Sequence, residues 1–215
     1  MHSCGIYVCV ASHFQATIEN RKLEAMPNIP ILILASGSGS RFQGVKQLQK
    51  IDGVPMIRRV VQTAMRARGG EVVVLLGAHL KEVEQEISNM PVTIVNSPYW
   101  DKGMAESIKT GVSHIEEHLP KVRAVMITLG DQPFIEVSDL DQLVSVYIEH
   151  PDKIVCAHYN NTCGVPAIFP ASRWNDLKQL SGDTGARELL RSGEDVLTVE
   201  MPGAGHDVDR RIDLI

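Results

Sequence analysis

The sequence predicts a three-layer α/β fold in which helices cover both faces of a mostly parallel central sheet. Apolar runs of strand length alternate along the chain with stretches of helical period. The first runs are apolar at every position, which is typical of strands buried on both faces of a parallel sheet. With 215 residues, 44% of them hydrophobic and 22% charged, the chain can bury one large core.

The expected elements follow one another regularly through the first two thirds of the chain. Strands are expected at residues 29–35, 71–77, 91–96 and 123–131, and helices at residues 55–70, 80–90, 104–119 and 137–150. In the first helix, apolar side chains such as Ile57, Val61 and Ala64 recur at helical spacing, and a pair of glycines ends it. Ser138 and Asp141 have the spacing of a capping box at the fourth helix.

The last third of the chain departs from this alternation. Residues 153–160 and 164–170 both have the composition of strands, and no helix separates them. Two short helical stretches and a final strand at residues 195–201 complete the chain. The C-terminal half is therefore expected to add mixed pairing at the edge of the sheet.

Composition limits the classes of function. We expect one domain at residues 26–215, preceded by an N-terminal extension of unknown role at residues 1–25. The apolar centre of that extension is too short to span a bilayer, so no membrane partner is expected. A net charge of -5 without a basic block argues against a nucleic-acid partner. The four cysteines form no C-x-x-C pair, which favours a cytoplasmic protein over a zinc protein.

A glycine-rich loop, LASGSGSRFQGVK, follows the first strand at residues 34–46. It is not a P-loop, because Val45 separates Gly44 from Lys46. It also lacks the dinucleotide fingerprint, because Phe42 takes the place of the third glycine. The glycines and cations still indicate phosphate binding, although neither a P-loop ATPase nor an NAD site is expected.

Polar residues follow two other strands at their carboxyl ends. Asn96 ends the third strand and Asp131 follows the fourth. Ligands of open sheets collect at this edge, so these residues and the glycine loop should converge. Asp131 can offer carboxylate oxygens to Mg²⁺, or it can cap the turn before Pro133.

Five stretches resemble, in order and spacing, the NTP-transferase superfamily, and within it the molybdenum cofactor cytidylyltransferases with their MobA-like NTP transferase domain. The loop LASGSGSRFQGVKQL is similar to the family signature LAAG-x-G-x-R-x-G-x-x-K-L, and TLGDQP, GMAESIKTGV, GVPAIF and LSGDTGARELL follow it. The resemblance implies a Rossmann-like nucleotidyltransferase fold. It also implies Mg²⁺-dependent transfer of a nucleoside monophosphate from an NTP to the terminal phosphate of molybdopterin, with pyrophosphate released. A molybdoenzyme or its chaperone would receive the product.

The resemblance assigns roles position by position. Arg41, Lys46 and Asp131 would be catalytic, since fixed cations stabilise the charge that grows on the leaving pyrophosphate. Asp131 and Asp209 would bind the Mg²⁺, although strand alternation puts Asp207 on the same face as Asp209 and leaves the second ligand open. The nucleotide-binding residues would be Leu34, Ala35, Ser36, Gly37, Gly39, Arg41 and Lys46. Asn96 is added to them because of its position at a strand end.

Two positions depart from the family pattern. Ser36 stands where guanylyl members have glycine and cytidylyl members usually have alanine, although TLGDQP and GMAESIKTGV favour CTP over GTP. Glu106 stands where a small residue is common, and its carboxylate would repel a bound phosphate unless it points away or the acceptor differs.

Other functions remain open from the sequence. The acceptor could instead be a sugar phosphate or a methylerythritol phosphate, or the chain could be a catalytically silent nucleotide-binding module. HIEEH at residues 114–118 matches the H-x-x-E-H pattern of inverted zinc metalloproteases, but no third ligand accompanies it.

Overall fold

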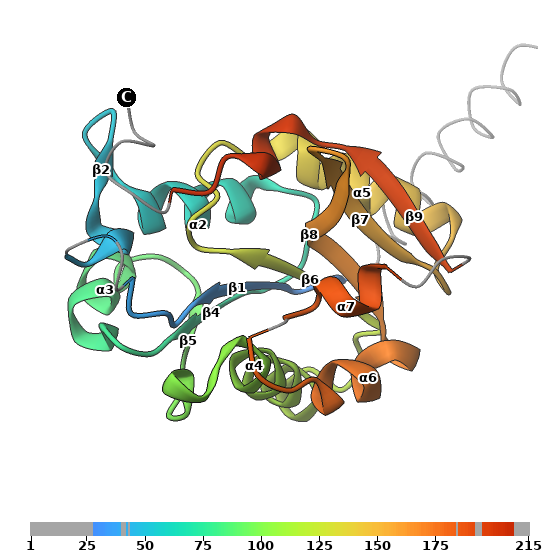
Figure 1. The fold of residues 1–215 in the computed structure, drawn as a ribbon, viewed down its shortest axis with the longest axis horizontal. Helices are drawn as coiled ribbons and strands as arrows, with labels where there is room; N and C mark the ends of the chain where they lie inside the picture. Colours follow the sequence, from blue (N-terminus) through green and yellow to red (C-terminus); the bar gives the residue numbers. More distant parts are fainter. Residues whose placement is uncertain (1–27, 40–41, 43, 184, 192–194, 209–215) are drawn as a thin grey trace, which may run out of the picture.

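The computed structural model describes residues 28–39, 42, 44–183, 185–191 and 195–208. Within these ranges a seven-stranded sheet lies between two layers of helices, in the strand order β5-β4-β1-β6-β8-β7-β9 (Figure 1). The strands are β1 Ile31–Ala35, β4 Val72–Leu76, β5 Thr93–Asn96, β6 Ala124–Leu129, β7 Ile154–Tyr159, β8 Thr162–Pro170 and β9 Val196–Glu200. The helices are α2 Met56–Arg66, α3 Leu80–Ile87, α4 Met104–His118, α5 Val137–Glu149, α6 Trp174–Gln179 and α7 Arg187–Leu190. The predicted three-layer α/β fold is confirmed.

β1 lies at the centre of the parallel part of the sheet. It pairs with β4 on one side and β6 on the other, and both pairings are parallel. Ile31 and Ile33 pack into the core under α2, α3 and α5, whereas Leu32 and Leu34 pack into the core over α4, α6 and α7. Every residue of β1 is therefore buried, which explains why the run is apolar throughout.

The mixed pairing begins inside the sheet. β8 lies between β6 and β7 and is antiparallel to both, while β9 pairs parallel with β7 at the edge. Ile127 of β6 is opposite Ala167, so the start of β8 lies beside the carboxyl end of β6. This arrangement brings Gly164 and Val165 to the edge where the parallel strands end.

The capping box of α5 lies two residues earlier than the sequence suggested. The helix begins at Val137, so Glu136 is the N-cap, and its side chain accepts the backbone N–H of Asp139. Asp139 Oδ2 in turn accepts the backbone N–H of Glu136 at 2.9 Å. The predicted pair of Ser138 and Asp141 was wrong because Asp141 Oδ1 accepts the backbone N–H of Arg68 at 2.6 Å.

A short hairpin between the glycine loop and α2 was not predicted. Its strands, β2 Lys50–Ile51 and β3 Val54–Pro55, have two residues each. Asp52 and Gly53 form the turn with φ values of 50° and 81°, a left-handed pair typical of Asp-Gly hairpins. Strands this short carry no periodic signal. Among the described helices, none has the length and apolar character that crossing a membrane would require.

Candidate functional site

The glycine loop after β1 is held in shape by its own backbone conformation and by one buried amide. Gly39 has φ +59°, and a Cβ there would lie 3.2 Å from Cβ of Lys46, so the position favours glycine. Gln47 is only 3% exposed and donates from Nε2 to the carbonyls of Ala35 at 3.2 Å and Gly37 at 3.1 Å. Gln47 therefore fixes the loop backbone beside Lys46.

Phe42 occupies the position of the third glycine of the dinucleotide fingerprint. In the dinucleotide fingerprint, a glycine at this position lets the helix pack closely on the strand. Here the Phe42 side chain is 3% exposed and belongs to a small core cluster with Met56 and Val208. A large side chain thus anchors the loop to the segment near the C-terminus.

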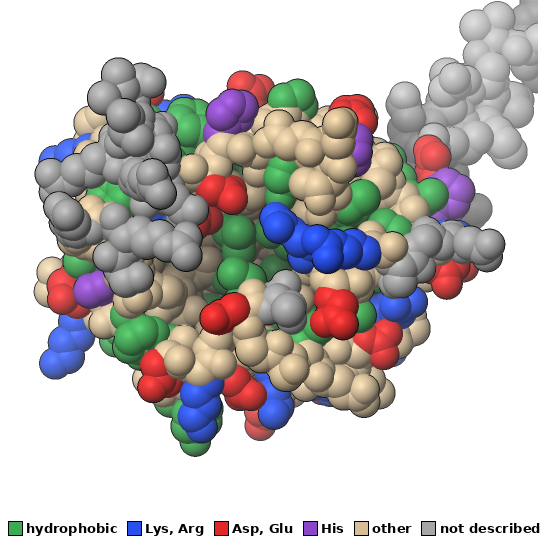
Figure 2. Space-filling view, viewed as in Figure 1, with side chains coloured by type: hydrophobic (Ala, Val, Ile, Leu, Met, Phe, Trp, Pro, Cys, Tyr) green, Lys and Arg blue, Asp and Glu red, His purple; other side chains and the backbone are tan. Residues whose placement is uncertain are grey.

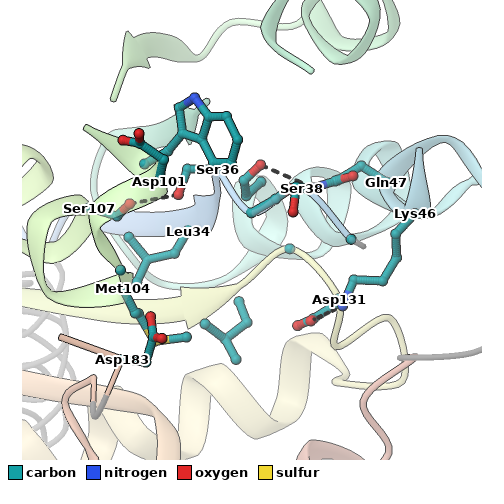
Figure 3. A pocket seen from close by; sticks show the side chains of 17 residues that line it. Leu34, Ser36, Ser38, Lys46, Gln47, Asp101, Met104, Ser107, Asp131 and Asp183 are labelled. Carbon is teal, nitrogen blue, oxygen red and sulfur yellow. Dashed lines mark hydrogen bonds and ion pairs between the residues drawn. The ribbon is translucent and has the colours of Figure 1, made fainter. Parts of the chain in front are cut away.

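A first cavity of about 410 Å³ opens over the loop, and Figure 3 shows its walls. Leu34, Ser36 and Lys46 come from β1 and the loop region, whereas Met104 and Ser107 come from α4. Its lining residues are Leu34, Ala35, Ser36, Gly37, Ser38, Gly39, Lys46, Gln47, Trp100, Asp101, Gly103, Met104, Ser107, Leu129, Gly130, Asp131 and Asp183.

Lys46 and Asp131 form an ion pair on the wall of this cavity. Lys46 Nζ donates to Asp131 Oδ2 at 2.6 Å, and the two side chains are only 12% and 22% exposed. Asp131 Oδ1 is buried and has no hydrogen-bond partner among the described residues. The backbone carbonyl of Asp131 accepts the N–H of Val208 at 3.1 Å, which ties the Asp207 segment to the same strand end.

Three buried serines form a hydroxyl chain beside the first cavity. Ser36 Oγ lies 2.7 Å from Ser107 Oγ, which lies 3.3 Å from Ser97 Oγ. Their side chains come from the loop after β1, from α4 and from the residue after β5. Because each hydroxyl can both donate and accept a hydrogen bond, these serines can act as donor or as acceptor toward a bound ligand.

A second cavity of about 700 Å³ shares one wall with the first. The shared residues are Leu34, Met104, Leu129, Asp131 and Asp183. The others are Ile108, Ile127, Tyr159, Gly164, Val165, Gly185, Ala186, Arg187, Glu188, Arg191 and Asp207. Figure 2 shows a hollow with a hydrophobic floor, with Lys or Arg side chains along one rim and acidic side chains nearby. Ligands in the two cavities would meet at Asp131.

Tyr159, on the wall of the second cavity, has a pKa raised by its surroundings. Burial raises the pKa of its hydroxyl, and the carboxylate of Asp207 raises that pKa further. Interaction with the guanidinium of Arg187 lowers the same pKa. The Tyr159 hydroxyl therefore lies within the influence of both charged side chains.

The structure brings most of the predicted site residues together. Leu34, Ala35, Ser36, Gly37, Gly39, Lys46 and Asp131 all line the first cavity. Asn96 is exposed at the end of the edge strand β5 and is not among the lining residues of either cavity, so its nucleotide contact stays a prediction. Arg41 and Asp209 lie outside the described residues. Asp207 lines the second cavity, whereas Glu106 lines neither.

Several lining residues were not predicted. Gln47, Ser107 and Asp183 all line the first cavity, and Tyr159 and Arg187 line the second. Asp183 and Arg187 belong to the stretch LSGDTGARELL, which marked the family but carried no assigned role. Gln47 directly follows the loop lysine, and this position in the sequence could have indicated that it lies at the site.

The donor set fits a divalent cation only in part. No group of three or more His, Cys, Asp or Glu side chains in the described part of the chain could hold a metal ion. Asp131 Oδ1, buried and without a hydrogen-bond partner there, is a suitable oxygen ligand. A cation at Asp131 would therefore need ligands from a bound phosphate, as is common for Mg²⁺.

The seven-stranded mixed sheet and its covering helices form an α/β fold like that of nucleotidyltransferases. Residues 31–196 match the MobA-like NTP transferase domain, and the chain belongs to that family. It is accordingly a member of the nucleotidyltransferase superfamily, and the family implies an NTP as substrate.

The chain is also similar to named relatives and, in its fold, to solved structures. Nicotine blue oxidoreductase of Paenarthrobacter nicotinovorans is 28% identical over 199 residues, covering 86% of this chain and 93% of that protein. A nucleotidyl transferase from Methanothermobacter thermautotroptrophicus has a TM-score of 0.74 at 23% identity, covering 86% of this chain and 94% of the other. Rv0371c from Mycobacterium tuberculosis H37Rv, solved with manganese, has a TM-score of 0.73 at 22% identity, with 86% and 95% covered. Other relatives are longer, and the chain spans 28% of the bifunctional protein GlmU of Legionella pneumophila, at 29% identity over 135 residues.

Proposed function

We propose that the protein transfers a nucleoside monophosphate from an NTP, with CTP favoured, to the terminal phosphate of a molybdopterin-type acceptor. The observation that carries the proposal is the ion pair of Lys46, which lines the first cavity, with Asp131, which lines both cavities. The NTP would occupy the first cavity and the acceptor the second. The α-phosphate of the NTP would then lie at their common wall, within reach of both substrates.

The transfer is an in-line displacement at the α-phosphorus. An oxygen of the ionised acceptor phosphate forms the new P–O bond, the bond to the β-phosphate bridging oxygen breaks, and pyrophosphate leaves. No general base is required, since the attacking phosphate carries its charge already. This is consistent with a site built from a loop, a lysine and carboxylates.

The residues of this chain would bind and orient the NTP. The loop at Gly37 and Gly39 lets backbone N–H groups approach the phosphates, and Lys46 would contribute its ammonium group to the leaving pyrophosphate. Asp131 would hold a divalent cation, expected to be Mg²⁺, with Asp207 or Asp209 as a further ligand. That cation, when bound, withdraws charge from the phosphate under attack. The manganese bound by Rv0371c supports a divalent metal in this fold.

The serine chain supports a choice among bases. Ser36 takes the place of a family glycine or alanine, and its hydroxyl is bound to Ser107 inside the wall of the first cavity. A serine there would leave less room than a glycine for the close approach of a purine. CTP is therefore favoured over GTP.

Redox chemistry is a second candidate function, which the oxidoreductase relative raises. The buried Phe42 argues against a dinucleotide bound in the manner of the G-x-G-x-x-G fingerprint. Within transferase chemistry, a sugar phosphate or methylerythritol phosphate could take the place of molybdopterin as acceptor. A silent nucleotide-binding module would bind the NTP and transfer nothing.

The deciding experiment incubates the protein with each of the four NTPs, labelled at the α-phosphate, together with Mg²⁺ and molybdopterin. We expect labelled product and pyrophosphate release with CTP in excess over GTP. Parallel reactions with sugar phosphates and methylerythritol phosphate test whether these compounds serve as acceptors, and NADPH oxidation tests for redox activity. Binding of CTP without transfer to any acceptor would contradict the proposal and indicate a silent module.

A further inference from the structure

The second cavity carries an arginine whose position is fixed by a tightly packed loop. Gly182 accepts the backbone N–H of Ala105 through its carbonyl at 3.1 Å, at the start of α4. A Cβ on Gly185, which has φ +59°, would lie 2.7 Å from Sδ of Met104. The loop is thus packed onto α4, and it leads directly into α7, whose first residue is Arg187.

Arg187 faces a wall that is rigid as well as polar. Tyr159 is 9% exposed, and a Cβ added to Gly164 would overlap its hydroxyl oxygen, so the phenol is held against the β8 backbone. Arg187 is close enough to Tyr159 to influence that hydroxyl electrostatically. The guanidinium therefore lies over the second cavity near a fixed hydroxyl group.

The floor of the same cavity is apolar. Leu34, Ile108 and Ile127 line it and are 7%, 0% and 0% exposed, and all three belong to the core around α4. Leu129 and Val165 extend this surface. A ligand that fits here offers a hydrophobic body to the floor and polar groups to the rim.

Of the charged side chains that line the second cavity, only the two arginines attract an anionic ligand. Asp131, Asp183, Glu188 and Asp207 line the cavity, and Lys46 compensates Asp131. Without Arg187 and Arg191 the remaining carboxylates would repel a phosphate. A guanidinium binds phosphate through paired N–H donors, which suits it to this position.

We propose that Arg187 determines acceptor specificity, by binding the anionic group of an acceptor whose apolar body packs on Leu34, Ile108 and Ile127. The proposal rests on the proposed function for its use in transfer, but the binding itself does not depend on the identity of the acceptor. The ligand class is an amphipathic phosphomonoester, with a hydrophobic ring system or chain attached to the phosphate.

The test measures binding of 1-naphthyl phosphate, an aryl phosphomonoester, by equilibrium dialysis. The first cavity is saturated with a non-hydrolysable CTP analogue, so that the probe meets only the second cavity. The variants are Arg187→Gln, which removes the charge, and Arg187→Lys, which keeps it. Arg66→Gln is the matched control, because Arg66 is an exposed arginine of α2, on the opposite face of the sheet.

We expect Arg187→Gln to raise the Kd of the probe about 10-fold or more, in line with loss of a hydrogen bond to a charged group. Arg187→Lys should retain part of the affinity, Arg66→Gln should retain all of it, and uncharged 1-naphthol should bind weakly to every variant. The proposal is overturned if wild-type protein fails to bind the probe, if Arg187→Gln binds it as well as wild type, or if the CTP analogue displaces it.

Failure of the proposed function gives a different result. It would appear as loss of CTP binding or of transfer in the wild-type protein, with probe binding still dependent on Arg187. Where transfer to molybdopterin is observed, Arg187→Gln should raise KM for the acceptor while KM for CTP stays unchanged. A merely structural role for Arg187 would change both constants and lower the thermal midpoint.

Discussion

The two cavities share a wall but are built from different parts of the chain and by different means. The first is shaped by main chain: the loop after β1, with Gly39 in a left-handed conformation and Gln47 bound to its carbonyls. The second is shaped by side chains from β7, β8 and α7, including Tyr159 and Arg187. The parallel half of the sheet supplies the first and the mixed half supplies the rest of the second.

This difference has a consequence for what each cavity can recognise. Backbone N–H groups present the same donors whatever the side chains are, which suits a constant ligand such as a triphosphate. Side chains on separate elements can change one at a time without altering the fold. Substitutions in the proposed nucleotide site should therefore be restricted mainly where they alter the loop backbone, as at Gly39 and Gln47, while the proposed acceptor site can be altered with the first left intact.

Asp131→Asn tests the point where the two cavities meet, and it has the largest expected effect. The substitution keeps the shape of the side chain and removes the charge that would bind the cation. We expect kcat to fall about 100-fold or more, equivalent to about 2.7 kcal/mol, in a Mg²⁺-dependent transfer assay. Asp209→Asn should behave similarly if that residue is the second ligand.

The matched control for this change is Asp152→Asn, which neutralises an exposed carboxylate on the turn after α5 and should leave kcat unchanged. Removal of the divalent cation with EDTA should abolish transfer by the wild-type protein. Full Mg²⁺-dependent activity in Asp131→Asn, or turnover supported by zinc in place of magnesium, would show that the assigned metal site is wrong.

Lys46→Met tests whether the first cavity can be altered alone. We expect KM for the NTP to rise about 10-fold or more, since a charge-assisted contact to the triphosphate is lost. Lys46 is 12% exposed and paired with Asp131, so its loss also leaves a partly buried carboxylate without its cation. The free energy of unfolding should accordingly fall by about 1–3 kcal/mol.

The control for Lys46 is Lys50→Met, since Lys50 is an exposed lysine of β2. Steady-state kinetics and thermal unfolding measure the two effects separately. Binding of 1-naphthyl phosphate to the second cavity should survive Lys46→Met. If affinity for the NTP is unchanged while probe binding is lost, the assignment of the NTP to the first cavity and of the acceptor to the second is wrong.

Ser36→Gly tests base selection, with a smaller expected effect. It widens the first cavity and removes the partner that Ser107 Oγ has at 2.7 Å. The ratio of kcat/KM for CTP to that for GTP should fall about 3- to 10-fold, the range of one net hydrogen bond. Ser36→Ala removes the hydroxyl but keeps Cβ, so it separates the effect of the lost hydrogen bond from that of the widened cavity. Ser145→Ala on α5 is the neutral control. An unchanged ratio in Ser36→Gly would exclude Ser36 as a determinant.

Most of the fold could be predicted from the sequence because its strands and helices carry strong periodic signals. β1 and β4 are apolar at every position, as expected for strands buried on both faces. The position of β8 inside the sheet was not predictable, because strand order depends on packing between segments distant in sequence. The start of α5 at residue 137 was predicted correctly, but its capping box was placed two residues too late, because Asp141 accepts the backbone N–H of Arg68 instead.

The candidate site was predictable to the extent that it is local. The loop residues from Leu34 to Lys46 share one motif, and residues 34–39 and Lys46 line one cavity with Asp131. The second cavity had no such motif, because Tyr159 and Arg187 lie on separate elements and meet only through tertiary packing. The ion pair between Lys46 and Asp131 likewise joins residues distant in sequence, and only the structure reveals it.

His114→Ala and His118→Ala should have the smallest effect, and they test a motif that belongs to neither cavity. The rings of the two residues stack at 4.1 Å, and His118 Nδ1 is hydrogen-bonded to the carbonyl of His114 at 3.0 Å. Burial and the neighbouring His118 lower the pKa of His114, and neither residue lines either of the two cavities. Nothing in the described part of the chain adds a third metal ligand to them. We therefore expect both variants to retain wild-type transfer kinetics, and zinc content measured by atomic absorption to be negligible in the wild type. Stoichiometric zinc that either substitution removes would restore the metalloprotease hypothesis for HIEEH.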